Sequence, residues 1–355
     1  MRRSREFLLG RGPDRDRSSK SAWGERYVHV VSRTAGQEIL FGDKEKETFR
    51  KILFKQLKFS GLRAIAWCFM GNHFHLLLEI PDREAALAQL SDEDVLSRLS
   101  VLKGEKATKF LLAELETCRQ NGDVLGVGRI VERVRKRLFD LSAFMKELKL
   151  KFTLAYNYST GRTGTLWDGR FKSILVQGGD ALRAVAAYID LNPVRAGLVR
   201  RPEDYRWCSY AAAVAGMRLA RNGLLTAISF ERKIPWAGAA ERYRELLFGK
   251  SQKVSGGNTP DGQVKSRGGL TQREIEAVLA AGGKLTLPQA LRCRVRYFTA
   301  GAVLGSQGFV DEFFESRRGE FGERRTSGGR RLKGAHWGDL RVLRDLRDHV
   351  VVPPG

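Results

Sequence analysis

Two apolar runs, 62–70 and 73–80, are separated by only Gly71 and Asn72. A two-residue connection of this composition between apolar runs is typical of a β-hairpin, so we expect a strand in each run. Pro81 directly follows the second run and ends it. The chain must therefore build a sheet that contains this antiparallel pair.

The second of these strands carries two histidines, His73 and His75, on either side of Phe74. Successive side chains of a strand point to opposite faces, so both imidazoles lie on one face while Phe74 enters the core on the other. Such a pair suits a metal site that is open to substrate. It is also compatible with two ordinary polar residues on the exposed face of a sheet.

Strand and helix patterns alternate through the rest of the first 250 residues. The run 27–32 is rich in β-branched residues and predicts a strand, and an amphipathic helix follows from Asp43 to Gly61. A further strand is expected at 171–176. The helix that begins at Asp180 must stop before Pro193, which disfavours helical geometry in the preceding residue. The order predicts an α+β fold.

Composition divides the chain into regions. Residues 1–22 are expected to form a flexible basic arm, and about 84–150 a helical insertion with breaks at Gly122 and at 126–128. Residues 251–269 have the composition of a linker. A compact helical module, compatible with a helix-turn-helix that binds DNA, is expected at 270–355.

The formal net charge of the 355 residues is +23, which points to a polyanion as partner. Basic proteins without a nucleic-acid function exist, so charge alone does not decide this. The four cysteines are scattered and are expected to be reduced. Because we find neither a signal peptide nor a run of about 20 apolar residues, we expect a cytoplasmic protein associated with the nucleoid through DNA.

A second candidate group for chemistry is Tyr188 and Asn192, which stand four residues apart and share one helical face. The amide oxygen of Asn192 could complete a metal site begun by two histidines, with the phenol alongside. The alternative is a core aromatic residue followed by an Asn helix cap. Tyr156 and Tyr158 are rival nucleophiles, but neither is followed by Asn or Gln at four residues.

Several stretches together resemble the REP-associated tyrosine transposases, a bacterial branch of the single-tyrosine HUH endonucleases. The stretch at 70–81, MGNHFHLLLEIP, is similar to their metal-binding strand, and YIDLNPVRAGLV at 188–199 to their tyrosine segment. Further similar stretches follow the same order in the chain: YVHVVSRTAGQEILF, TGTLWDGRFKSILV and EDYRWCSY. The similarity runs from about Trp23 to Tyr210, and 292–313 resembles the C-terminal extension of longer members.

The resemblance implies a ferredoxin-like antiparallel sheet with helices on one face. It also implies that His73, His75 and Asn192 hold Mg²⁺ or Mn²⁺ and that Tyr188 is the nucleophile. The implied reaction is the cleavage and rejoining of single-stranded, hairpin-forming repeat DNA through a 5′-phosphotyrosine, by a homodimer. Two alternatives stay open: a protein that binds DNA hairpins without cutting them, and a metal-dependent nuclease that uses water.

Basic and aromatic residues near the tyrosine helix are candidates for DNA binding, because cations contact phosphates and aromatic rings stack on unpaired bases. The candidates are Arg162, Trp167, Arg170, Lys172 and Arg195. For the loop residues among them, the alternative is a packed Trp167 with charges that simply face water.

Overall fold

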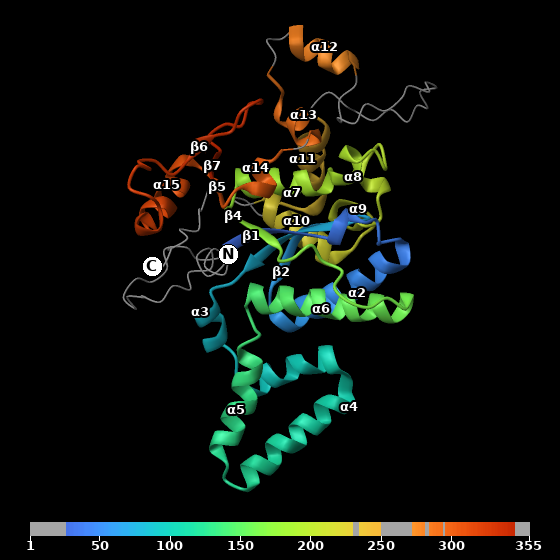
Figure 1. The fold of residues 1–355 in the computed structure, drawn as a ribbon, viewed down its shortest axis with the longest axis vertical. Coiled ribbons are helices and arrows are strands. Elements are labelled where there is room, and N and C mark those ends of the chain that lie inside the picture. The colour runs from blue at the N-terminus through green and yellow to red at the C-terminus, as the bar shows by residue number, and fades with distance from the viewer. Residues whose placement is uncertain (1–25, 230–233, 250–271, 281–283, 294, 345–355) are drawn as a thin grey trace, which may run out of the picture.

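The computed structural model describes residues 26–229, 234–249, 272–280, 284–293 and 295–344 (Figure 1). The expected basic arm at 1–22 and the expected linker at 251–269 lie outside these residues. Among the described helices, none combines the length and the apolar character that crossing a membrane requires.

The first four strands form the sheet that the sequence analysis expected. They are β1 (Arg26–Arg33), β2 (Arg63–Phe69), β3 (His73–Ile80) and β4 (Lys172–Val176), arranged in the order β2-β3-β1-β4 with every neighbouring pair antiparallel. The connecting helices are α2 (Asp43–Ser60) and α6 (Leu141–Thr160). This order and these directions are those of a ferredoxin-like fold, so the predicted α+β class is confirmed.

Local sequence explains where these elements begin and end. The hairpin between β2 and β3 closes with a hydrogen bond from the amide of Met70 to the carbonyl of His73 (2.8 Å), as Gly71 and Asn72 predicted. Helix α2 stops at Gly61, which adopts a left-handed conformation with φ of 76° and donates its amide to the carbonyl of Leu57.

The two faces of the sheet are covered differently. On one face, Phe74 packs against Phe49 of α2, and Phe152 of α6 lies against Phe49 in turn. The prediction of helices on one face needs a correction, because a second helical layer covers the histidine face (Figure 1). That layer holds α7 (Asp180–Asp190), α8 (Asn192–Arg195), α9 (Ser209–Val214), α10 (Arg218–Ile228) and α11 (Trp236–Phe248). Helix α7 is buried on almost every side, so it needs protein on both sides.

Helix α10 approaches strand β2 so closely that only glycine fits at position 223. A Cβ atom on Gly223 would lie 2.5 Å from the carbonyl oxygen of Ala64 and 2.6 Å from that of Ile65. Backbone atoms cannot move aside as a flexible side chain can. The contact therefore depends on the absence of a side chain.

We expect Gly223→Ala to lower the free energy of unfolding by about 1–3 kcal/mol, because the methyl group pushes α10 away from β2. Gly238→Ala is the matched control, since Gly238 lies in α11 and a Cβ atom added there would have no other atom within 4 Å. There the better helix propensity of alanine should raise stability by up to about 1 kcal/mol. Urea unfolding of both variants measures the difference, and equal stabilities would contradict the close approach.

The insertion is helical, as predicted, and has its own apolar cluster. It consists of α3 (Arg83–Ala88), α4 (Asp92–Gln120) and α5 (Val124–Arg135), and Figure 1 shows α4 and α5 extending away from the sheet. Gly122 does separate α4 from α5, but 126–128 lies inside α5 and is no break, because Asp123 caps that helix through the amide of Gly126. The insertion also ends before the predicted residue 150, because α6 begins at Leu141 and is one of the helices that cover the sheet.

The C-terminal part differs from the predicted helical module. It contains α12 (Gln272–Ala280), α13 (Leu287–Arg292), α14 (Tyr297–Ala300) and α15 (Gln307–Glu315), but also strands β5 (Val303–Gly305), β6 (Arg330–Arg331) and β7 (Arg341–Leu343). Strand β5 pairs in parallel with β4, and the sheet continues as β4-β5-β7-β6. Strands this short show no alternating pattern. Because this region shares the main apolar core, it is not a separate helical domain.

Three short 3₁₀ helices complete the described elements: η1 (Ala35–Gln37), η2 (Pro202–Asp204) and η3 (Arg318–Glu320).

Candidate active site

The two histidines of β3 lie side by side on the face of the sheet that α7 covers. The ring centroids of His73 and His75 are 5.2 Å apart. Metal–nitrogen bonds are about 2.0–2.2 Å long, so two imidazoles at this separation can share one ion between them. The expectation that both rings share a face is met, with Phe74 on the other side.

A chain of hydrogen bonds fixes how His75 is oriented. The Nδ1 of His29 lies 2.7 Å from the carbonyl oxygen of Phe298, and its Nε2 lies 2.9 Å from Nδ1 of His75. Burial lowers the pKa of His29 to about 4 and that of His75 well below its usual range, so both rings are neutral.

The direction of the protons in this chain follows from the carbonyl at its end. A carbonyl oxygen only accepts, so Nδ1 of His29 carries the proton and its Nε2 accepts from Nδ1 of His75. The proton of His75 is thus committed to Nδ1, and the lone pair on Nε2 is left for a ligand. This is the usual way in which a second group prepares a histidine for metal binding. His29 was not among the residues predicted for the site, although its side chain lies on the same face of β1 as Val31, which pairs with His75.

A similar contact orients His73. Its Nδ1 lies 2.7 Å from the side-chain oxygen of Asn72, the turn residue that precedes it. The amide oxygen accepts, so Nε2 of His73 presents a lone pair. The side-chain nitrogen of Asn192 lies 3.2 Å from this Nε2. Rotation of that amide by half a turn would bring its oxygen to the same place.

Tyr188 lies on the same side of the sheet as the histidine pair. Its ring centroid is 6.2 Å from that of His75 and 5.1 Å from that of Phe298 in α14. The side chain is 4% exposed, because α14 and Arg195 cover it. Tyr188 and Asn192 belong to α7 and α8, whose boundary at Leu191 falls just before Pro193, as expected.

Arg195 lies directly over the phenol ring. Its guanidinium carbon is 3.8 Å from the ring centroid of Tyr188, and its Nη1 donates to the carbonyl of Leu291 (2.9 Å). The Nη2 atom is buried and has no hydrogen-bond partner among the described residues. Burial lowers the pKa of Arg195, yet a guanidinium keeps its charge in proteins. A buried cation therefore stands beside the phenol.

The end of α7 is anchored by Asp190, two residues after Tyr188. One carboxylate oxygen accepts from the hydroxyl of Ser209 (2.7 Å) and the amide of Tyr210 (2.9 Å), and the other from the hydroxyl of Tyr243 (2.7 Å). Asp190 is fully buried, and burial raises its pKa to about 6. This network fixes the helix that carries the phenol against α9 and α11.

The residues present fit a divalent cation, although His, Cys, Asp and Glu alone do not supply a complete site. Within the described residues there is no group of three or more such side chains that could hold a metal. The third ligand would have to be the amide of Asn192, and its nitrogen already faces Nε2 of His73. In this set the amide oxygen is the ligand type that suits Mn²⁺ or Mg²⁺, while the imidazole nitrogens also suit transition-metal ions such as Zn²⁺.

The predicted DNA-binding residues are not all accessible to DNA. Trp167 is 6% exposed and packs against Phe74 and Phe152 on the opposite face of the sheet from the histidines, while its Nε1 donates to Thr153 (2.9 Å). Its assignment as a base-stacking residue is therefore corrected, because a small loop places its apolar ring in the core. Arg162 pairs with Glu38 (3.3 Å).

Other cations do lie near the histidine pair. Lys172 is exposed and stands in one row across the sheet with Val31 and His75. Arg170 is exposed two residues earlier. Arg33, which the sequence analysis did not single out, is paired with His73 across β1 and β3 and is half-buried. Arg33 and Lys172 therefore lie on the histidine face.

The rival tyrosines are on the wrong side of the sheet. Tyr156 packs against Phe152 in α6, with ring centroids 6.2 Å apart, and Tyr158 is 94% exposed near the end of that helix. Helix α6 covers the face that carries Phe74. Neither phenol is near the histidine pair, which leaves Tyr188 as the phenol beside it.

No protein-family model matches the sequence, and no curated protein matches it. Among solved structures, the chain is similar to one described as "Structure of the REP associates tyrosine transposase bound to a REP hairpin". The two sequences are 16% identical, and the match covers 57% of this chain and 86% of that chain with a TM-score of 0.34.

Proposed function

We propose that this protein is a transposase-type endonuclease and strand transferase for single-stranded DNA, with Tyr188 as its nucleophile. One observation carries the proposal. Tyr188, His73, His75 and Asn192 come from three elements, β3, α7 and α8, and converge on one face of the sheet. A phenol next to a prepared metal site is the arrangement that tyrosine-dependent cleavage of a phosphodiester needs.

The ligands we propose for Mg²⁺ or Mn²⁺ are Nε2 of His73, Nε2 of His75 and the amide oxygen of Asn192. When bound, the ion would withdraw charge from a non-bridging oxygen of the scissile phosphate. Phenols ionise near pH 10, so the attacking oxygen needs help at neutral pH. The guanidinium carbon of Arg195 lies 3.8 Å from the ring centroid, so a positive charge stands beside the attacking group.

The proposed step is an in-line substitution at phosphorus. The hydroxyl of Tyr188 loses its proton to water, and its oxygen forms a new bond to phosphorus as the bond to the 3′-oxygen breaks. The leaving oxygen takes up a proton, which gives a free 3′-hydroxyl and a 5′-phosphotyrosine. A 3′-hydroxyl of another strand can reverse the substitution, so strands are joined without an external energy source.

The proposed substrate is single-stranded DNA that forms hairpins, as the sequence resemblance implies. The net charge of +23 and the cations Arg33 and Lys172 on the histidine face favour a polyanionic strand there. One nucleophilic tyrosine per chain can hold one DNA end at a time, so we further propose a homodimer that acts on DNA in the cytoplasm.

A labelled hairpin oligonucleotide with single-stranded flanks tests the proposal. After incubation with the protein and Mn²⁺, we expect a protein–DNA adduct that survives denaturing electrophoresis. The adduct should not form when EDTA is present during the incubation. Cleaved products without an adduct would instead indicate a nuclease that uses water.

A hairpin-binding protein without cleavage is the second candidate, and the burial of Tyr188 favours it. A side chain that is 4% exposed must gain access to the phosphate before it can react. Tight hairpin binding with neither adduct nor cleavage, at every Mn²⁺ and Mg²⁺ concentration, would favour this candidate.

The role of His29 yields a separate prediction about metal affinity. His29→Ala should weaken Mn²⁺ binding by about 10- to 100-fold, because Nδ1 of His75 then loses the partner that fixes its proton. Isothermal titration calorimetry on the full-length protein measures this without any reaction. Gln56→Ala is the matched control, since Gln56 is equally buried but bonds to Glu147 on the other helical layer. Equal affinities in the two variants would refute the orienting role.

A further inference from the structure

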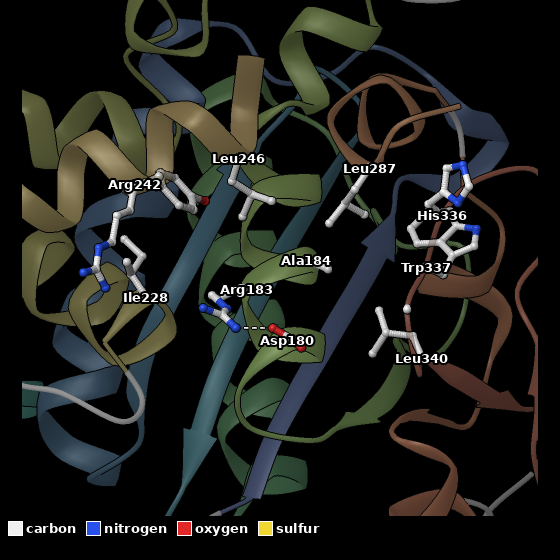
Figure 2. Close-up of a pocket in the computed structure, with 12 residues that line it drawn as sticks. Asp180, Arg183, Ala184, Ile228, Arg242, Leu246, Leu287, His336, Trp337 and Leu340 are labelled. Atoms are coloured by element: carbon white, nitrogen blue, oxygen red, sulfur yellow. Dashed lines mark hydrogen bonds and ion pairs between the residues drawn. The ribbon is translucent and has the colours of Figure 1, made fainter. Parts of the chain in front are cut away.

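A cavity of about 290 Å³ lies where the tyrosine helix meets the C-terminal region (Figure 2). Its size is near the lower end of small-molecule pockets, which begin at roughly 300 Å³. It opens between the first turns of α7, the helices α11 and α13, and the segment 336–340 that precedes β7. None of the residues proposed above for chemistry lines it.

The middle of the cavity is apolar. Figure 2 shows Leu246, Ala184 and Leu287 between its two ends, with Trp337 beside Leu287. The indole of Trp337 is held in place, because its Nε1 donates to the carbonyl of Lys333 (3.0 Å). A flat, apolar group with polar edges is the kind of ligand that such a lining accepts.

Positively charged or donor groups stand at both ends. Figure 2 shows Arg242 at one end and His336 at the other. Both are exposed, and neither side chain has a hydrogen bond or ion pair among the described residues. Arg183 also lines the cavity, but it is paired with Asp180. Two unpaired donor groups therefore flank an apolar centre.

The cavity is close to the proposed nucleophile. Ala184 precedes Tyr188 by four residues on the same face of α7, a distance of about 6 Å along a helix. Phe298 links the two places from the other side, because its ring contacts both Tyr188 (5.1 Å) and Trp337 (5.7 Å). A DNA strand whose phosphate reaches Tyr188 can therefore place a neighbouring nucleotide in the cavity.

We propose that this cavity binds one unpaired base of the DNA strand, with the base on the apolar centre and phosphates of the same strand at Arg242 and His336. A strand that crosses the cavity brings phosphates to both ends, whereas a free nucleotide carries phosphate on one side only. The proposal rests on the proposed function, since it names how that site's substrate is held. The start of α7 would then form part of the binding site for single-stranded DNA.

Binding of a fluorescent oligothymidylate, measured by anisotropy over a salt series with EDTA present, tests this on the full-length protein. Arg242→Ala should reduce the slope of log affinity against log salt by about 0.7, the value for one lost phosphate contact on a single strand. Leu246→Phe, which fills the centre without changing charge, should weaken binding about tenfold, in line with the loss of one base contact. Arg218→Ala is the matched control, an exposed arginine on α10 outside the cavity.

The outcomes separate this inference from the proposed function. Circular dichroism checks that the Arg242→Ala and Leu246→Phe variants are folded. If both then bind the oligonucleotide as tightly as Arg218→Ala does, the cavity is not a DNA-binding site, even if the covalent adduct forms. Reduced binding in both variants supports the cavity even if no adduct forms with any DNA. Competition by free thymidine monophosphate at concentrations near those of the oligonucleotide would overturn the two-phosphate arrangement in favour of a free nucleotide.

Discussion

Tyr188→Phe is expected to abolish the covalent protein–DNA adduct, with a loss of at least about a thousandfold in strand cleavage. The change removes a single oxygen atom. The ring that packs between His75, Phe298 and Arg195 stays in place, so the fold and the affinity for DNA should be retained. Denaturing electrophoresis of a labelled hairpin strand measures the adduct, and anisotropy measures binding of the same strand.

Tyr158→Phe is the matched control, because it makes the same change in an exposed phenol on α6, across the sheet from the histidines. It should leave the adduct unchanged. Adduct formation that persists in Tyr188→Phe and disappears in Tyr158→Phe would show that the strand reaches the other side of the sheet. The proposed mechanism would then be wrong as a whole.

The parts of the fold that could be predicted are those set by neighbouring residues. Gly71 and Asn72 predicted the hairpin, Gly61 the end of α2, and Pro193 the break after α7. Alternation along β3 placed both histidines on one face. The spacing of four residues put Tyr188 and Asn192 on either side of the junction between α7 and α8, rather than within one helix. Each of these is a property of a few consecutive residues, and a single sequence displays it directly.

The parts that could not be predicted depend on contacts between distant residues. Strand β5 forms by pairing with β4, which lies more than a hundred residues earlier, and its three residues show no alternation of apolar and polar side chains. His29 acquires its role from Phe298 and His75, which lie in other elements. Trp167 was a candidate for base stacking because basic residues lie close to it in the sequence, yet packing against residues distant in the sequence buries it.

The second large effect is expected at Asp190, which fixes the helix of the nucleophile. Asp190→Ala should lower the free energy of unfolding by about 3–5 kcal/mol, because it leaves the hydroxyls of Ser209 and Tyr243 and the amide of Tyr210 buried without their acceptor. Asp190→Asn keeps an oxygen for Ser209 and Tyr210, so it should lose much less. Urea unfolding at neutral pH measures both.

The pH dependence of stability provides a second, independent test of the role of Asp190. Burial raises the pKa of Asp190 to about 6 in the folded protein, from 3.8 for an ordinary aspartate. Between these values the folded state holds more protons than the unfolded state, so the stability that comes from this pKa difference is fully present below pH 3.8 and is lost as the pH rises through 6. The hydrogen bonds that Asp190 accepts contribute separately. Asn cannot titrate, so the difference in stability between wild type and Asp190→Asn should shift towards the variant over this window. A difference that stays constant from about pH 4 to 7 would show that the carboxylate is ionised throughout, held so by its three donors.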